Sequence, residues 1–189
     1  MSVRFGRGRL RVLSQRIDPA SPKFMNIDYK QINNANSLME LHKQVSKALP
    51  GMLARTEEEC SLEYFQNVID SSLKSGIIIG AYDGNNLIGF IYAGRSSLKV
   101  FSHILLNVTM AVHPGYQGKG IGKELFRRFM SEVKLKDDIT RIELFVVEVN
   151  KKAIKLYESF GFQKEGIFKK RAAANGKVVD DIAMAWLRG

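Results

Sequence analysis

The sequence predicts one mixed α/β domain, in which about four helices flank a central mixed β-sheet. Three observations support this fold class. The 189 residues are 45% hydrophobic and 25% charged, as in an ordinary globular protein. Apolar residues recur at helical spacing before Gly76 and follow a strand-like pattern directly after it. Helix and strand patterns then alternate to the end of the chain, as in α/β proteins.

The first part of the domain is expected to contain one strand and two helices. A short strand at 27–32 precedes apolar residues at helical spacing over 38–49, which stop at a Pro-Gly pair. A second helical face runs over 62–76 and ends at a glycine. Thr56 and Glu59 have the spacing of a capping box, so we expect them at the start of this second helix.

The second part of the domain is expected to contain six strands and two helices. In order, they are a hairpin of strands at 77–82 and 87–93, a strand at 104–112, a helix at 121–133, a strand at 141–149, a helix at 150–160, and two strands around Asn175-Gly176. The complete order is therefore β-α-α-β-β-β-α-β-α-β-β.

The net charge of +10 is distributed unevenly. Residues 1–24 contain six basic side chains against Asp18 alone, which gives this segment a charge of +5. We therefore expect a basic N-terminal arm over 1–24 and the domain over 25–189. The arm suits contact with phosphates of nucleic acid or of an anionic cofactor. A solvated tail, a targeting sequence, or a start upstream of the true one at Met25 explains the same composition.

Several classes of protein are excluded by what the chain lacks. No apolar run approaches the roughly 18 residues of a membrane span, and no signal peptide is evident, so we expect a cytoplasmic protein with no membrane contact. The single cysteine, Cys60, excludes an internal disulfide, and we expect it to pack within a helix rather than act as a nucleophile. His103 and His113 lack metal-ligand spacing, so no metal site is predicted.

A glycine-rich turn at 117–122 joins a predicted strand to a predicted helix. Three glycines at alternate positions allow backbone N–H groups to approach a ligand, and the positive end of the helix favours phosphate. Two familiar phosphate loops do not fit. A P-loop requires glycine where Gln117 stands, and a dinucleotide fingerprint requires glycine at Lys123. Taken alone, the three glycines are explained better by the geometry of a tight turn than by a ligand.

Two segments together resemble signatures of the GNAT superfamily of N-acetyltransferases. Gln117 to Gly122 after a strand is similar to the acetyl-CoA-binding signature [RQ]-x-x-G-x-[GA]. Further along the chain, Asn150, Ala153, Tyr157 and Gly161-Phe162 match the pattern N-x-x-A-x-x-x-Y-x-x-x-G-F. The two motifs occur in the order expected for the family, and the resemblance covers about residues 25–189.

The resemblance implies acetyl-CoA as cosubstrate and assigns its binding residues. The backbone of Met110, Ala111 and Val112 is expected to pair with the pantetheine arm. The pyrophosphate is expected at Gln117, Gly118, Lys119, Gly120, Ile121, Gly122 and Lys123, where the two lysines add positive charge. Asn150 is expected to hydrogen-bond the pantetheine amide, although a helix N-cap explains this residue as well.

The resemblance also implies that Tyr157 is the general acid that protonates the departing thiolate of CoA. The alternative is an aromatic residue that packs on a helix face. The general base is left open, because an ordinary surface carboxylate explains each candidate: Glu148, Glu143 and Glu59. Asn107 and Thr109 are alternatives that would orient a water molecule.

These features predict an N-acetyltransferase that moves acetyl from acetyl-CoA directly to a primary amine. The acceptor is a small amine, an amino acid, an antibiotic or a protein amino group. The positive net charge disfavours a polyamine. The alternative is a non-catalytic CoA-binding or nucleic-acid-associated module that uses the basic arm. The sequence leaves the oligomeric state open.

Overall fold

A computed structural model describes residues 26–189, and the predicted basic arm lies outside this range. Within it, the strands are β1 (Ile27–Lys30), β2 (Ile77–Asp83), β3 (Asn86–Arg95), β4 (Ile104–Val112), β5 (Arg141–Val147), β6 (Gln163–Ala174) and β7 (Lys177–Leu187). The α-helices are α1 (Ala35–Ala48), α2 (Leu62–Ser75), α3 (Ile121–Lys134) and α4 (Lys151–Ser159). The predicted element order and the mixed α/β class are both confirmed.

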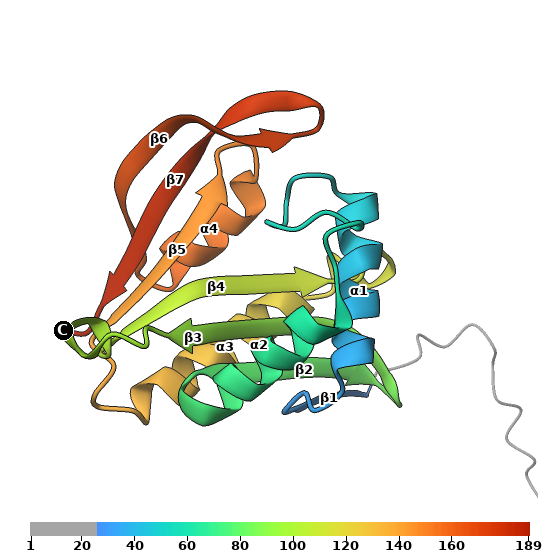
Figure 1. The fold of residues 1–189 in the computed structure, drawn as a ribbon, viewed down its shortest axis with the longest axis horizontal. Coiled ribbons are helices and arrows are strands. Elements are labelled where there is room, and N and C mark those ends of the chain that lie inside the picture. The colour runs from blue at the N-terminus through green and yellow to red at the C-terminus, as the bar shows by residue number, and fades with distance from the viewer. Residues whose placement is uncertain (1–25) are drawn as a thin grey trace, which may run out of the picture.

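The strands form one seven-stranded sheet in the order β1-β2-β3-β4-β5-β7-β6. Five of its neighbouring pairs are antiparallel, and the pair β4–β5 is parallel. Helices α1 and α2 cover one face of the half formed by β1 to β4, while α3 and α4 lie on the opposite face of the sheet (Figure 1). We call the face that carries α1 and α2 the front face.

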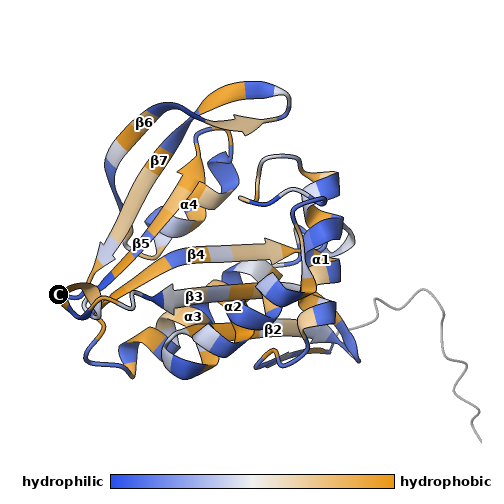
Figure 2. Cartoon of the chain, in the orientation of Figure 1, coloured by the Kyte–Doolittle hydropathy of each residue, from blue (hydrophilic) through white to orange (hydrophobic). Residues whose placement is uncertain are grey.

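Each face of the sheet has its own hydrophobic core, because strand side chains alternate between the two faces. On the front face, Phe90 and Tyr92 pack with Phe65 and residues of α1. On the opposite face, Phe126 and Phe129 of α3 are fully buried. Helices α1 and α2 alternate between hydrophilic and hydrophobic residues along their length, as amphipathic helices do (Figure 2).

The boundaries of the second helix differ from the prediction. Ser61, and not Thr56, is the N-cap of α2, and its Oγ accepts a hydrogen bond from the Tyr64 amide at 3.2 Å. The Thr56 amide donates to Glu59 Oε2 at 2.9 Å, so this pair forms a turn in the connection between α1 and α2. Cys60 therefore lies before the helix and not within it. Both segments carry a capping residue, and Ser61 is the one that directly precedes the helix, which begins at Leu62.

The feature that positions the site is a separation between β4 and β5. In the described residues these strands pair only at Ile104–Arg141 and Leu105–Ile142. Beyond this point β4 follows β3 while β5 follows β7, and the two strands diverge (Figure 1). Asn107 has a φ of +56° at a register irregularity between β3 and β4. This β-bulge bends β4 next to the opening.

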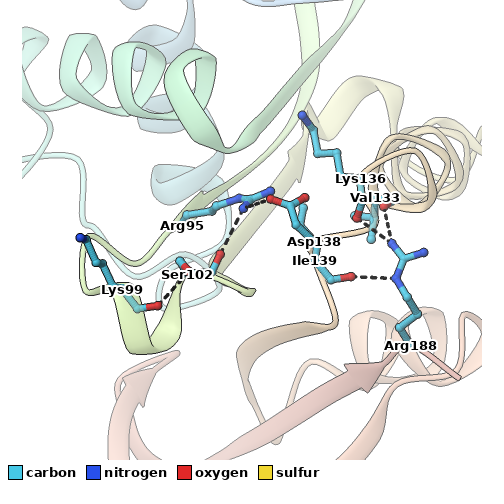
Figure 3. A network of polar contacts seen from close by, with 8 residues as sticks. All are labelled: Arg95, Lys99, Ser102, Val133, Lys136, Asp138, Ile139 and Arg188. Carbon is cyan, nitrogen blue, oxygen red and sulfur yellow. Dashed lines mark hydrogen bonds and ion pairs between the residues drawn. The ribbon is translucent and has the colours of Figure 1, made fainter.

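The closed end of this opening is fastened by a polar network (Figure 3). Arg188, after β7, donates from Nε to the Ile139 carbonyl and from Nη2 to the Val133 and Lys136 carbonyls, each at 2.8 Å. Val133 lies in the last turn of α3, where backbone acceptors lack helical partners, and Lys136 follows the C-cap residue Leu135. Arg95 of β3 is paired with Asp138 at 2.5 Å. The network joins the end of α3 to the start of β5 and the end of β7.

Candidate active site

The predicted glycine turn is an open, left-handed segment at the far end of β4. Gly118 and Gly120 have φ values of +77° and +79°, which residues with a side chain adopt only at a cost. A Cβ atom at either position meets no protein atom within 4 Å. The space beside both backbones is therefore empty of protein and accessible to a ligand.

The helix that follows begins without a side-chain cap. Gly120 is the N-cap of α3, and the first intrahelical bond runs from the Glu124 amide to the Gly120 carbonyl at 3.0 Å. The amides of Ile121, Gly122 and Lys123 precede that bond, so they have no intrahelical acceptor. With the positive end of the helix dipole, these three N–H groups form a site suited to an anion.

Three hydrogen bonds hold the turn in this conformation. The Tyr116 hydroxyl donates to Asp83 Oδ2 at 2.7 Å, and this bond raises the pKa of the tyrosine. His113 Nδ1 accepts from the Gly115 amide at 3.1 Å. Gln117 Nε2 donates to the Val112 carbonyl at 3.1 Å. Contacts within the protein thus define the turn, and the Gln117 side chain serves its structure.

Basic side chains surround the anion site. Lys119 lies 5.0 Å from the centre of the Tyr116 ring. Glu124 is bound by Arg127 and also by Arg128, and these hydrogen bonds lower the pKa of its carboxyl to about 2. The site therefore keeps a positive balance even though it contains a carboxylate.

A pocket of about 370 Å³ opens beside this turn. Its lining residues come from the start of α3 and the end of α4: Gly120, Lys123, Glu124, Arg127, Ser159 and Phe160. A second hollow, of about 440 Å³, lies at the other edge of the sheet between β1, β2, α2 and α3, and none of the predicted site residues lines it. The pocket at the glycine turn is therefore the one that continues the anion site.

The free edge of β4 presents backbone groups to the opening between β4 and β5. The His113 amide donates to the Ile88 carbonyl of β3, so by the antiparallel alternation Ala111 also turns its N–H and C=O toward β3. Met110 and Val112 turn theirs the other way, into the opening. Of the three residues predicted to pair with pantetheine, Met110 and Val112 therefore have backbone groups that face away from β3, and Ala111 does not. The Val112 carbonyl already accepts one hydrogen bond from Gln117.

Asn150 is the N-cap of α4. Its Oδ1 accepts from the Ala153 amide at 3.2 Å, and the helix begins at the next residue, Lys151. The N-cap role, which the sequence offered as the alternative, is therefore present. Because Oδ1 makes the cap, only Nδ2 of this side chain is left to donate to a ligand.

Tyr157 lies on α4 with its ring in the core opposite the front face. The ring centroid is 5.3 Å from that of Phe126 and 6.0 Å from that of Phe162, and the residue is 7% exposed. Burial raises the pKa of Tyr157 to about 12, so the hydroxyl stays protonated at neutral pH. The packing role is thus established, and the protonated hydroxyl retains the capacity to donate.

The three carboxylates considered as bases each make a local contact. Glu143 accepts from Arg141 Nε at 2.5 Å, and Glu148 Oε1 accepts from the Asp180 amide at 3.4 Å. Glu59 accepts from the Thr56 amide in the turn described above. None of these contacts singles out one of the three as the base.

The structure adds residues that the sequence did not single out. Tyr92 of β3 is opposite Thr109 in register and is 6% exposed. Its hydroxyl interacts with the side chains of Thr109 and Tyr64, and burial raises its pKa far above the ordinary value. Thr109 in turn donates to the Asn107 carbonyl at 3.1 Å, at the bulge. The only signal for Tyr92 in the sequence was strand alternation, which marks it as core.

Comparison with known proteins identifies the family. Residues 38–162 match the family model of the acetyltransferase (GNAT) family. The chain is 35% identical over 102 residues to N-alpha-acetyltransferase RimI of Mycobacterium tuberculosis, a match that covers 52% of this chain and 59% of the relative. It is 36% identical over 76 residues to the L-amino acid N-acetyltransferase AaaT of Escherichia coli, covering 40% of this chain and 47% of that protein. The matches thus span about half the length of these relatives.

Solved structures agree on the fold. A GNAT-family acetyltransferase of Streptococcus pneumoniae superposes with a TM-score of 0.78 at 19% identity, over 86% of this chain and 99% of that one. The acetyltransferase yncA of Salmonella typhimurium, solved with its cofactor acetyl-CoA, gives a TM-score of 0.74 at 17% identity, over 86% and 94%. The family predicted from the two signatures is confirmed: the chain belongs to the acetyltransferase (GNAT) family.

Proposed function

We propose that this protein transfers an acetyl group from acetyl-CoA to a primary amine. The observation that carries the proposal is the divergence of β4 and β5, which leaves one edge of β4 without a strand partner between the bulge at Asn107 and the uncapped start of α3. An anion site at one end and a strand edge with free backbone groups suit a ligand that has a pyrophosphate and an extended amide arm.

The binding of acetyl-CoA follows this geometry. The amides of Ile121, Gly122 and Lys123 would hold the pyrophosphate, with positive charge from Lys119 and Lys123 nearby. The N–H and C=O groups of Met110 and Val112 would pair with the pantetheine amides as a neighbouring strand does. Asn150 Nδ2 would donate to a pantetheine carbonyl while its Oδ1 caps α4. The turn at Gln117, Gly118 and Gly120 supplies the shape of the site.

The transfer is a direct displacement. The lone pair of the acceptor nitrogen attacks the thioester carbon, the C–S bond breaks, and the amine loses one proton to a base. We assign Tyr157 as the general acid that hydrogen-bonds the departing thiolate, which takes its proton in the end from water. A thiol has a pKa near 8.5, well below that of this buried tyrosine, so its hydroxyl assists chiefly as a hydrogen-bond donor to the developing charge.

The proton of the amine leaves through water in this scheme. Asn107 and Thr109 lie at the bulge, and the nearby Tyr92 hydroxyl interacts with Thr109. These polar groups would orient a water molecule beside the attacking nitrogen. The three carboxylates Glu59, Glu143 and Glu148 are not needed as bases.

The acceptor enters from the front face. The RimI relative is named for acetylating α-amino groups and the AaaT relative for L-amino acids, so both classes are candidates. In residues 26–189 no helix is long and apolar enough to cross a membrane. A cytoplasmic location stays a prediction, as does contact with nucleic acid through residues 1–24.

Release of free CoA thiol, measured with acetyl-CoA and a panel of amines, tests the proposed activity. We expect amine-dependent thiol release together with acetylated product of matching amount. Gly120→Val should abolish acetyl-CoA binding, because a branched residue resists the φ of +79° and fills the space beside the turn. Thiol release that is independent of every amine would contradict the proposal, as would tight acetyl-CoA binding by the Gly120→Val protein.

A further inference from the structure

Arg55 differs from every other arginine that the structure describes. Six of the seven arginines in residues 26–189 have a carboxylate within 4.0 Å: Arg95, Arg127, Arg128, Arg141, Arg171 and Arg188. No ion pair of this kind is formed by Arg55, although Glu59 is close enough to affect its pKa. A guanidinium is always charged at neutral pH, and no carboxylate of the described residues lies within 4.0 Å of this one.

The position of Arg55 is fixed by its surroundings. Its carbonyl accepts from the Ser46 hydroxyl at 2.8 Å, and Ser46 is itself buried in α1. Its guanidinium lies 3.7 Å from the centre of the Tyr64 ring, and Nη1 donates a hydrogen bond to the Glu59 carbonyl at 3.4 Å. Stacking on an aromatic ring immobilises the guanidinium while leaving in-plane N–H donors for a planar anion.

This fixed cation lies near the proposed reaction centre. Arg55 contacts Tyr64, and both interact with Tyr92, which lies opposite Thr109 of β4. The Thr109 hydroxyl donates a hydrogen bond to the Asn107 carbonyl at the bulge. Two side chains, those of Tyr64 and Tyr92, therefore separate the guanidinium from Thr109, near the point where β4 and β5 diverge.

The same side of the sheet is the one from which an acceptor can approach. On the opposite face, α3 and α4 pack in one continuous core with β5 and β7. On the front face, the connection between α1 and α2 meets the tip of the β6–β7 hairpin, where the Asn175 amide donates to the Pro50 carbonyl at 3.3 Å. The connection that carries Arg55 thus borders the front of the opening.

We propose that Arg55 binds the carboxylate of the acceptor, and hence that the acceptor is a free amino acid. The proposal rests on the proposed acetyltransferase activity and names its substrate class. A carboxylate next to the reacting amine matches the fork of the guanidinium, which forms two parallel hydrogen bonds. A peptide N-terminus and a simple alkylamine lack that carboxylate, so they would leave the guanidinium unpaired.

The test compares each L-amino acid with its own carboxamide as acceptor in the thiol-release assay. In the wild type we expect kcat/KM to favour the amino acid, and Arg55→Gln should reduce this preference by roughly 10- to 100-fold. Arg55→Lys should retain part of it, because lysine keeps the charge and loses the fork. The carboxamide also has a less basic amine, so the amino acid-to-carboxamide ratio is compared between wild type and variant, which cancels this difference.

Two controls separate this proposal from the activity on which it rests. Lys47→Gln removes a cation from the end of α1, where Lys47 is exposed and paired with Glu57, and it should leave the ratio unchanged. Acetyl-CoA affinity and melting temperature of Arg55→Gln show whether the variant is folded.

An unchanged ratio in a folded Arg55→Gln protein would overturn the role of Arg55. Equal use of an amidated peptide and free amino acids by the wild type would overturn the substrate class. The absence of thiol release with every amine would instead refute the acetyltransferase activity.

Discussion

Gln117 donates a hydrogen bond from Nε2 to the carbonyl oxygen of Val112 at 3.1 Å, and this bond ties the glycine turn back to the end of β4. The first residue of the acetyl-CoA signature therefore acts on the shape of the turn. We expect Gln117→Ala to weaken acetyl-CoA binding by about fivefold, the equivalent of one neutral hydrogen bond of roughly 1 kcal/mol. Calorimetric titration measures this change. Gln66→Ala, in the exposed face of α2, is the matched control and should bind normally. Equal affinity in both variants would show that this bond does not maintain the turn.

Tyr157→Phe should lower kcat and leave acetyl-CoA affinity unchanged, because the ring keeps its packing against Phe126 and loses only the hydroxyl. Loss of a general acid costs roughly 10²- to 10⁴-fold, and we expect the lower end because water can protonate a thiolate. Tyr116→Phe provides the contrast. It loses the bond to Asp83 that holds the turn, so it should weaken acetyl-CoA binding more than it lowers kcat. If Tyr157→Phe turns over at the wild-type rate with chemistry rate-limiting, Tyr157 is a packing residue only.

The buried side chain of His42 should make the free energy of unfolding depend on pH. It is 2% exposed, and burial followed by the charge of Arg55 lowers its pKa to about 4. The unfolded chain takes up this proton near pH 6.5 and the folded protein only near pH 4, so the stability contribution of neutral His42 is present above pH 6.5 and lost as the pH falls toward 4. The full loss amounts to at most about 3 kcal/mol. Urea unfolding at pH 7.5 and pH 5 measures the part of this loss that occurs above pH 5.

His42→Asn serves as the control for that pH dependence. It removes the titrating group and retains a polar atom near Ser46, with which His42 Nδ1 now bonds at 3.2 Å. We expect the variant to be less stable at pH 7.5 but to lose less stability than the wild type on acidification to pH 5. An identical pH slope in the two proteins would show that other groups carry the effect.

Arg188→Ala should destabilise the protein by roughly 2–4 kcal/mol, because it leaves three backbone carbonyls without a charged donor. Arg188→Lys keeps the charge but cannot reach all three acceptors with a single ammonium group, so we expect an intermediate loss. Urea unfolding measures both changes. A destabilisation below about 0.5 kcal/mol, the usual size for surface substitutions, would mean that the network does not fasten this end of the sheet.

Most of the fold could be predicted because hydrophobic periodicity records it directly. The switch from helical to strand patterns at Gly76, and the stop signals at glycine and proline, place the α-helices and strands in order. The start of α2 was misplaced because two adjacent segments, at Thr56 and Ser61, carry similar capping residues. Local chemistry does not distinguish them, whereas packing of the helix face on the sheet does.

In the candidate site, too, local features could be predicted from the sequence and tertiary ones could not. The glycine turn and the position of Asn150 before a helix are local, so the sequence contains them. Which backbone groups of Met110, Ala111 and Val112 face the opening depends on the pairing of β4 with β3, which is a tertiary property. Along the chain, Arg55 is 37 residues from Tyr92 and 52 residues from Asn107 at the bulge. Only the folded structure shows that these residues are near one another.

A crystal structure of the protein with CoA would locate the bound cosubstrate independently of turnover. We expect pyrophosphate oxygens within hydrogen-bonding distance of the Ile121, Gly122 and Lys123 amides, and the pantetheine arm along Met110 and Val112 between β4 and β5. The thiol should then lie near the Tyr157 hydroxyl. A CoA molecule bound elsewhere, or an opening that stays free of ligand at saturating CoA, would contradict the account.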